Sequence, residues 1–445
     1  MIEAMDAATP LALACDYFRT DICHSCGWLS SSYPEQIATK NHRAYELLQP
    51  FAAEIGIEWH KPYESLPESF RNKVKLVVTG STKHPNFGIL TNPRTGAGAD
   101  LRSCPLPTLG IREAIRPLAD FTAHIGLPPY NMHTDRGVLK YLIIVESPLG
   151  ELMVRFVVRR RGVQGAIFKH IDELYEALPM LRVCSINVQP EHKAIIAGAE
   201  EILVSDDAVL PMQLELGGNV GTYGQMLTLG LTPGAFFQTN TGAAQTLYLR
   251  AQEWLGAAAD VEADETAAGA VEVTAKVAEA GAADETSAVA KRKNCPDRRT
   301  AWDLYCGVGG FGLALASQGG WSVTGVETEE SAVTAARWAT RENKLNDAAQ
   351  FVVADALTWA KERTAAGDAL PDAVIVNPPR RGVGTDMATW LEQSGVPCVL
   401  YSSCNVESLA HDLAAMPSYR ITRAQVVDMF PHTSHFEVIA LLVRK

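Results

Sequence analysis

The glycine-rich run DLYCGVGGFG at 303–312 constrains the fold more than any other part of the sequence. It continues from an apolar, strand-like stretch at 301–305 and leads into residues with helical character. Glycines at 307, 309 and 312 let the backbone turn tightly and approach a ligand closely. The next strand-like stretch ends at Glu327, whose carboxylate can accept hydrogen bonds from both hydroxyls of an adenosine ribose. The pattern predicts a nucleotide-type cofactor; a tight turn with a structural glutamate is the alternative.

The C-terminal part alternates strand-like and helical stretches over about 150 residues, which predicts a parallel, doubly wound α/β sheet. The strand-like runs are 301–305, 322–327, 350–354, 373–376, 398–401 and 436–443. The region 70–225 has short β-type runs instead, at 74–78, 141–146, 153–158, 183–188 and 202–204. It predicts a mainly β accessory domain.

The segment 256–297 separates these parts. Its first portion, 256–290, is rich in alanine and carries eight acidic residues and one lysine, which supply more than half of the formal charge of −12. It predicts a solvated linker, with a long surface helix as the alternative. Because the rest of the chain is much less acidic, a nucleic-acid partner is not excluded by charge.

A proline-stiffened loop helps to identify the cofactor. The run Asn377-Pro378-Pro379-Arg380-Arg381-Gly382 follows a predicted strand, where the carboxyl edge of an α/β sheet places ligands. It resembles the fourth motif of class I methyltransferases that act on bases and amines. The resemblance favours S-adenosylmethionine over NAD, and a plain turn is the alternative.

Two residues supply the reactive groups that methylation of a pyrimidine needs. Cys404 follows the strand-like run 398–401, at the same sheet edge as Gly307 and Asn377. A thiolate that adds to carbon 6 of uracil turns carbon 5 into a nucleophile. A base must then remove the carbon 5 proton, and Glu437, at the start of the last strand-like run, is the candidate.

The runs DLYCGVGGFG, NPPRRG, YSSCN and DMFPHTSHFE resemble those of the bacterial RNA uracil-5-methyltransferases over nearly the whole chain, apart from roughly 256–297. The resemblance implies a class I S-adenosylmethionine-dependent methyltransferase domain with a Rossmann-like α/β fold. It implies that Cys404 is the nucleophile and Glu437 the base. Cofactor contacts would come from Gln238, Tyr305, Glu327 and Asn377, with Asp355 as a further position near the adenine. Tyr305 stands where the family usually has phenylalanine.

Cysteines in the N-terminal half form a C-x7-C-x2-C array, Cys15, Cys23 and Cys26, which Cys104 can complete. From spacing alone, four thiolates can hold zinc or an iron–sulfur cluster, and His24 keeps a mixed zinc site open. The resemblance implies a 4Fe-4S cluster with a structural role, because family members that act on 23S rRNA carry one on such an array and the tRNA enzymes lack it. It therefore favours 23S rRNA, at a loop uridine, as the substrate.

These patterns divide the chain into a cysteine-rich iron–sulfur segment within 1–110, a central β-rich RNA-binding domain at 70–225 and a methyltransferase domain at 226–445. Cations at 70–75 and 155–161 adjoin β-type runs and are candidate phosphate contacts, although a solvated face would look the same. Clustered cysteines, with neither an export signal nor a long apolar run, predict a cytoplasmic protein without a membrane span. The alternatives are a tRNA uracil-5-methyltransferase and a non-catalytic iron–sulfur RNA-binding protein.

Overall fold

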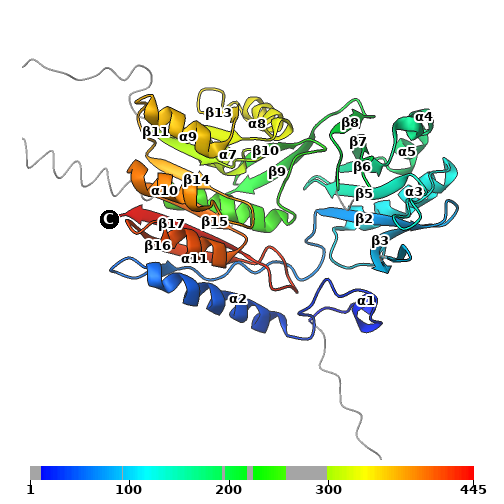
Figure 1. Ribbon diagram of the computed structural model, residues 1–445, viewed down its shortest axis with the longest axis horizontal. Coiled ribbons are helices and arrows are strands. Elements are labelled where there is room, and N and C mark those ends of the chain that lie inside the picture. Colours follow the sequence, from blue (N-terminus) through cyan, green and yellow to red (C-terminus); the bar gives the residue numbers. More distant parts are fainter. Residues whose placement is uncertain (1–11, 93, 193–195, 218–223, 257–297) are drawn as a thin grey trace, which may run out of the picture.

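Two β-sheets organise the protein into a C-terminal lobe and a central lobe, as the computed structural model in Figure 1 shows. The structure describes residues 12–92, 94–192, 196–217, 224–256 and 298–445. The acidic stretch predicted as a linker therefore lies, apart from Gly256, outside the described residues.

The C-terminal lobe is built on an eight-stranded sheet of order β1-β16-β17-β15-β14-β11-β12-β13. Its strands are β1 (Glu58–Trp59), β11 (Arg299–Leu304), β12 (Trp321–Glu327), β13 (Ala349–Val353), β14 (Ala373–Val376), β15 (Cys398–Ser403), β16 (Tyr419–Val427) and β17 (Glu437–Arg444). Strands β11 to β15 run parallel as predicted, whereas β17 is antiparallel to both β15 and β16. The expectation of an all-parallel sheet was wrong at this edge, because the loop 428–436 is too short for a parallel crossover.

Helices cover both faces of this sheet. One face carries α7 (Gly310–Ser317), α8 (Glu330–Glu342) and the helix over 241–256. The other face carries α2 (Tyr33–Leu48), α9 (Ala356–Ala365), α10 (Thr385–Ser394) and α11 (Val406–Ala414). Each face therefore has its own apolar core, and the carboxyl ends of the parallel strands remain open between the helices.

The central lobe has a seven-stranded sheet of order β4-β3-β2-β5-β6-β7-β8. Its strands are β2 (Lys73–Gly80), β3 (Pro85–Asn92), β4 (Ala97–Asp100), β5 (Leu139–Glu146), β6 (Leu152–Val158), β7 (Leu181–Val188) and β8 (Glu200–Leu203). Helices α3 (Leu109–His124), α4 (Gln164–Lys169) and α5 (Ile171–Ala177) pack on one face, where alternate strand residues are apolar. The lobe is thus mainly β, with helices on one side.

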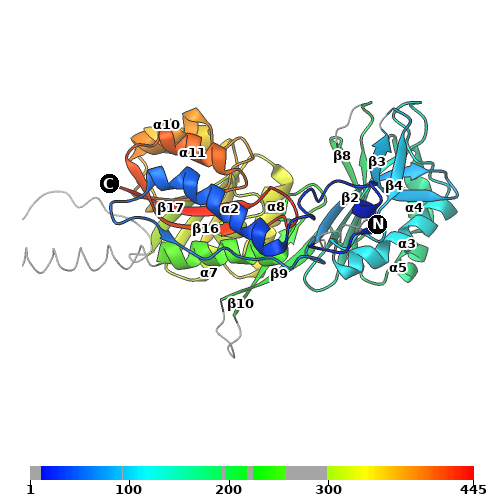
Figure 2. The ribbon, with the colours of Figure 1, turned by 90° about the horizontal axis from the view of Figure 1, so that it is seen from below.

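Two segments pack outside the domain limits that the sequence suggested. The hairpin of β9 (Leu210–Leu216) and β10 (Gln225–Leu231) spans the expected boundary at 225, yet its buried leucines join the core of the C-terminal lobe beside α8. Helix α2 and strand β1, from the predicted cysteine-rich segment, also belong to this lobe, where α2 lies beside α11 (Figures 1 and 2). Apolar side chains such as Ala44 and Leu48 account for this packing, because burial against the sheet removes them from water.

The described residues on either side of 257–297 meet at one turn. On one side, the Cβ position of Gly256 lies 2.9 Å from Nε2 of Gln318. On the other, the backbone N–H of Arg299 donates to the carbonyl oxygen of Gly320 at 2.9 Å. The two flanks therefore approach each other across residues 318–320.

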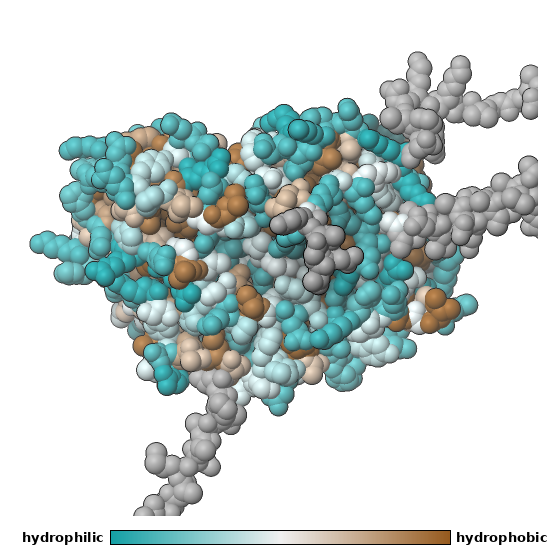
Figure 3. All heavy atoms as spheres, turned by 180° about the vertical axis from the view of Figure 1, so that it is seen from behind, coloured by the Kyte–Doolittle hydropathy of each residue, from teal (hydrophilic) through white to brown (hydrophobic). Residues whose placement is uncertain are grey.

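The surface seen in Figure 3 intermingles hydrophilic and hydrophobic residues, and its hydrophobic patches are small and scattered. Within the described parts of the chain, no helix combines the length and the apolar character needed to cross a membrane.

Candidate active site

A cavity of about 640 Å³ opens at the carboxyl ends of the parallel strands. It brings together residues that the sequence spreads from position 236 to position 437. The predicted site residues that line it are Gln238, Tyr305, Glu327, Asp355, Asn377, Cys404 and Glu437. Sequence-distant motifs therefore converge on one hollow, as the topology of an α/β sheet requires.

The glycine-rich turn forms one wall of this cavity. Tyr305 and Gly307 have left-handed φ angles of 68° and 54°, and Gly309, at 82°, precedes the first turn of α7. A left-handed tyrosine is an uncommon, strained conformation, of the kind that concentrates at binding sites. Gly310 permits a close approach, since a Cβ there would lie 2.2 Å from the hydroxyl oxygen of Tyr248. The local sequence thus matches the backbone path.

Two acidic residues stand at the ends of neighbouring strands. Glu327 accepts hydrogen bonds from the backbone N–H groups of Gly307 at 3.1 Å and Thr328 at 2.7 Å, which fix its carboxylate next to the glycine turn. Asp355 caps α9 by accepting from the N–H of Thr358 at 2.9 Å. Hydrogen bonds from Thr358 hold the pKa of Asp355 below its usual value, so this carboxylate is charged at neutral pH.

Gln238 reaches the cavity on a loop that the central lobe holds in place. The side-chain amide of Asn72 donates to the carbonyl oxygen of Gln238 at 3.1 Å and to Oγ1 of Thr241 at 2.8 Å. The backbone N–H of Asn72 donates to the carbonyl oxygen of Thr239 at 2.9 Å. Asn72 is buried, so these bonds form a firm connection between the two lobes at the cavity.

Cys404 and Glu437, the predicted nucleophile and base, line the cavity together with Arg380. Burial raises the pKa of Glu437 to about 8, against opposing effects of the Ser402 side chain and the Arg380 charge. Burial and the nearby Glu437 carboxylate raise the pKa of the Cys404 thiol, while Arg380 lowers it. Within the described structure, Oε2 of Glu437 is buried without a hydrogen-bond partner. The carboxyl group is therefore free to exchange a proton with a ligand in the cavity.

Sequence reasoning did not assign three further residues of this cavity. Arg380 belongs to the NPPRRG run and Phe430 to the DMFP run, so both lay next to a recognised signal. Tyr248 lies on the helix over 241–256 and contacts the ring of Phe311 edge-on, with centroids 5.0 Å apart. No local pattern marks this tyrosine, because only the tertiary packing of the helix brings it to the cavity.

Comparisons with known proteins agree with this geometry. The family model described as tRNA (Uracil-5-)-methyltransferase matches residues 294–445. The 23S rRNA (uracil(747)-C(5))-methyltransferase RlmC of Pectobacterium atrosepticum is 36% identical over 431 residues, which cover 97% of this chain and 99% of that protein. RlmC of Pasteurella multocida is 35% identical and covers 97% and 100%. The chain belongs to the RNA uracil-5-methyltransferase family. It is therefore a methyltransferase.

The fold of this methyltransferase also has a solved counterpart. The crystal structure of Pyrococcus abyssi tRNA (uracil-54, C5)-methyltransferase, in complex with S-adenosyl-L-homocysteine, superposes with a TM-score of 0.66. The match covers 95% of this chain and 86% of that chain at 22% sequence identity. It establishes a shared α/β methyltransferase architecture.

A second cavity of the methyltransferase, of about 180 Å³, gathers the cysteine array. Cys15, Cys23, Cys26 and Cys104 line it together with Arg71. Burial and the neighbouring thiols raise the pKa of Cys26 to about 12, and the Arg71 cation opposes this rise. These cysteines, predicted to act as a group, do lie together around one hollow.

The basic run at 155–161 is mostly ion-paired in the methyltransferase. Arg155 is 8% exposed and its Nε lies 2.9 Å from Oε1 of Glu201, while Arg159 pairs with Asp135 and Arg161 with Glu200. Acidic residues of β8 and of an adjoining loop thus neutralise three of the arginines that are candidate phosphate contacts. In the other basic run, Lys75 is exposed and its Nζ lies over the ring of Tyr141, 5.3 Å from its centroid.

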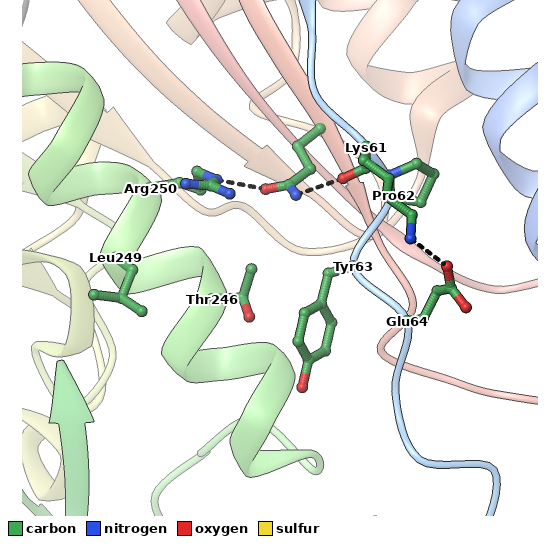
Figure 4. A pocket seen from close by; sticks show the side chains of 8 residues that line it. Lys61, Pro62, Tyr63, Glu64, Thr246, Leu249 and Arg250 are labelled. Carbon is green, nitrogen blue, oxygen red and sulfur yellow. Dashed lines mark hydrogen bonds and ion pairs between the residues drawn. The ribbon is translucent and has the colours of Figure 1, made fainter. Parts of the chain in front are cut away.

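A further hollow, of about 400 Å³, lies between the helix over 241–256 and the segment 61–64 (Figure 4). Its polar groups satisfy one another. Nε of Arg250 donates to Oε1 of Gln425 at 2.7 Å, Nε2 of Gln425 donates to the carbonyl oxygen of Lys61 at 2.7 Å, and Nζ of Lys61 lies 3.4 Å from a Glu64 oxygen. We assign no ligand to this hollow; its contacts join the segment to β16.

Proposed function

We propose that this methyltransferase transfers a methyl group from S-adenosylmethionine to carbon 5 of a uridine in 23S rRNA. The observation that carries the proposal is the meeting of Cys404 and Glu437 in one cavity with the candidate cofactor residues. The RlmC relatives, whose names specify a 23S rRNA uracil, support the choice of RNA.

The residues of the cavity fit S-adenosylmethionine. Glu327, at the end of β12, would accept the ribose hydroxyls, and Asp355 would lie near the adenine. Tyr305 offers an aromatic ring, while Gln238 and Asn377 offer amides for the polar atoms. When bound, the cofactor supplies a methyl group on a positively charged sulfur. The donor set matches a ligand with apolar, polar and cationic parts.

The proposed reaction begins at Cys404. Its thiolate adds to carbon 6 of the uracil ring, which forms an S–C bond and moves the electron pair of the carbon 5–carbon 6 double bond into an enolate. Arg380 stabilises the thiolate, because its charge lowers the pKa of this thiol. Carbon 5 then attacks the methyl group, and the sulfur of the cofactor keeps the electron pair of the broken bond.

Glu437 completes the proposed reaction. Its carboxylate removes the proton from carbon 5, the ring double bond re-forms and the thiolate of Cys404 leaves carbon 6. The buried, unpartnered Oε2 atom is suited to this step, since no hydrogen bond within the described structure must first break. The products are 5-methyluridine, S-adenosylhomocysteine and the regenerated thiolate, with the carbon 5 proton on Glu437.

The RNA must present its uracil away from a base stack for Cys404 to reach carbon 6. A loop or single-stranded uridine therefore suits this site better than a base-paired one. Exposed Lys75, whose Nζ lies over the buried Tyr141 ring, offers a cation for a phosphate of such a strand.

We also propose that the second cavity holds a 4Fe-4S cluster with a structural role. Cys15, Cys23, Cys26 and Cys104 would be its ligands, which matches the donor set that such clusters prefer. Because burial raises the pKa of the Cys26 thiol to about 12 and also raises that of Cys104, these two thiols would be protonated without a metal, and binding iron would release their protons. Arg71 would offset the negative charge of the thiolates.

Metal analysis of anaerobically purified protein tests the cluster. We expect iron and sulfide in the wild type and their loss in Cys26→Ala, whereas Cys184→Ala, which changes a cysteine outside the array, should retain both. Stoichiometric zinc without iron would overturn the cluster assignment.

Mapping of 5-methyluridine by mass spectrometry tests the function. We expect a strain that lacks the gene to lose the modification at one uridine of 23S rRNA, and we expect the wild-type gene but not Cys404→Ala to restore it. Loss confined to tRNA would keep the chemistry and reject the proposed substrate. An unchanged pattern would favour a protein that binds RNA without modifying it.

A further inference from the structure

The loop 428–436 joins β16 to β17 and contributes to both cavities. Phe430 lines the active-site cavity, and Glu437 follows at the first position of β17. Pro431 and Thr433 line the cysteine cavity. The position of the proposed base therefore depends on the conformation of this loop.

A fully buried ion pair holds the start of the loop. Nζ of Lys40, on α2, lies 2.6 Å from Oδ1 of Asp428, and both side chains are completely inaccessible to solvent. The same ammonium group donates to the carbonyl oxygen of Phe430 at 3.1 Å. Tyr33 is the first residue of α2 and directly follows the capping residue Ser32. Its hydroxyl donates to Oδ2 of Asp428 at 2.7 Å.

The segment 61–65 forms further hydrogen bonds with Asp428. The backbone N–H of Asp428 donates to the carbonyl oxygen of Tyr63 at 3.0 Å. Oγ of Ser65 donates to the carbonyl oxygen of Asp428 at 2.5 Å and accepts from Nδ2 of Asn240 at 2.8 Å. Figure 4 shows this segment running alongside β16. Every polar group of Asp428 thus has a partner.

The core does not need an ion pair at this position, because apolar side chains could fill the same space. Two charges removed from water cost free energy that their attraction only partly returns, and well-packed apolar residues often replace such pairs without loss of stability. Stability alone therefore does not account for it. The pair instead fixes the orientation of the loop. Lys40 and Tyr33 hold both carboxylate oxygens of Asp428. Lys40 also holds the carbonyl group of Phe430, in the backbone that leads to Glu437.

We propose that Lys40, Asp428 and Tyr33 are positioning residues that hold the loop 428–436 so that the Glu437 carboxyl group faces the carbon 5 proton. The inference rests on the proposed function, since it concerns the removal of that proton. It predicts a specific defect, in which the thiol and methyl group add normally and the elimination step fails.

The test compares covalent protein–RNA adducts formed with natural uridine RNA and S-adenosylmethionine, measured on denaturing gels. Glu437→Gln should give the largest fraction of covalent adduct, because this variant lacks the base. The double variant Lys40→Met/Asp428→Leu removes both charges and leaves neither unpaired, so it should fold. We expect it to accumulate adduct and to lose about tenfold or more in kcat, with the KM for S-adenosylmethionine changed by less than about twofold.

The matched control is Arg43→Met. Arg43 lies on the same helix, one turn from Lys40, and pairs with Glu407 on α11, with side chains 53% and 46% exposed. Within the described structure it makes no hydrogen bond or ion pair with the loop. This variant should turn over like the wild type without accumulating adduct.

The outcomes separate the two proposals. A wild type that makes no 5-methyluridine in any RNA would reject the proposed function and the positioning role with it. A wild type that methylates, beside a folded double variant with equal kcat and no adduct, would reject the positioning role alone. If thermal melting shows the double variant unfolded, Tyr33→Phe decides: a raised adduct fraction supports the role, and a wild-type fraction overturns it.

Discussion

At the scale of single residues, Glu437 and Cys404 have protonation equilibria that oppose their proposed tasks. Burial raises both pKa values, Glu437 to about 8, although a base and a nucleophile act in their deprotonated forms. The Glu437 carboxylate also disfavours the thiolate form of Cys404. Only one of them needs to carry a negative charge at any moment of the proposed reaction, because the thiolate is already bonded to carbon 6 when the carboxylate acts.

The rate of turnover should therefore rise with pH. Between pH 6.5 and 8 we expect kcat to increase about fifteenfold, since the deprotonated fraction of a carboxyl group with a pKa of about 8 grows from about 0.03 to about 0.5 over this range. A pH profile of kcat with saturating RNA and cofactor measures this. A flat or falling profile over this range would contradict the raised pKa or the role of Glu437.

The same raised pKa predicts how stability depends on pH. The carboxyl group of Glu437 titrates near 4.5 when unfolded and near 8 when folded, so the wild type loses stability as pH rises across that interval. The Glu437→Gln variant should not lose stability in this way, because glutamine does not titrate. Its melting temperature should therefore exceed that of the wild type by a margin that grows from pH 5 to 8. The difference in unfolding free energy should not exceed about 5 kcal/mol. A margin independent of pH would show that this carboxyl group does not titrate as proposed.

At the scale of elements, the sequence predicts the parts of the site that lie in continuous motifs. The runs around Tyr305, Asn377 and Cys404 each follow a parallel strand, and parallel strands bring their carboxyl ends to one edge. Strand β16 was not predicted, because its arginines at 420 and 423 interrupt the apolar pattern. The Lys40–Asp428 pair was not predictable either, since it joins residues 388 positions apart that have no local signature.

The first turn of α7 should not tolerate even one added methyl group. Gly310→Ala would place a Cβ 2.2 Å from the Tyr248 hydroxyl oxygen, so the ring or the helix must move, at a cost of about 1–3 kcal/mol. We expect a lower melting temperature and weaker binding of S-adenosylmethionine, measured by calorimetry. Gly165→Ala, in the first turn of α4 with no atom within 4 Å of its Cβ position, is the control and should be neutral or slightly stabilising. Equal behaviour of the two variants would contradict the close packing at α7.

At the scale of the whole molecule, the lobes are connected where the chemistry is proposed to occur. Asn72 of the central lobe bonds to the Gln238 loop, and Trp28, near the cysteine array, donates its backbone N–H to the carbonyl oxygen of His432 at 3.0 Å. The domain limits predicted from the sequence assign α2 and β1 to the cysteine-rich segment. Their packing on the eight-stranded sheet instead means that the N-terminal part supports the loop that leads to Glu437.

Replacement of 257–297 by a short glycine–serine linker should leave methylation largely unchanged. Its described flanks meet at residues 318–320, so a short connection can close the chain without distorting β11. The measurement is kcat/KM for RNA together with the melting temperature, and both should stay within about twofold and a few degrees of the wild type. A large loss of RNA affinity with unchanged melting would reveal a role in substrate binding.

The closeness of the two flanks makes this turn a suitable place for inserted sequence. A site where the chain leaves and returns at one turn admits new sequence of almost any length, because each doubling of a flexible connection costs only about 0.6 kcal/mol. An insertion or deletion there would leave Tyr305, Asn377, Cys404 and Glu437 in register. The same turn is a place to graft an affinity tag, a fluorescent reporter or a second RNA-binding module onto a working methyltransferase.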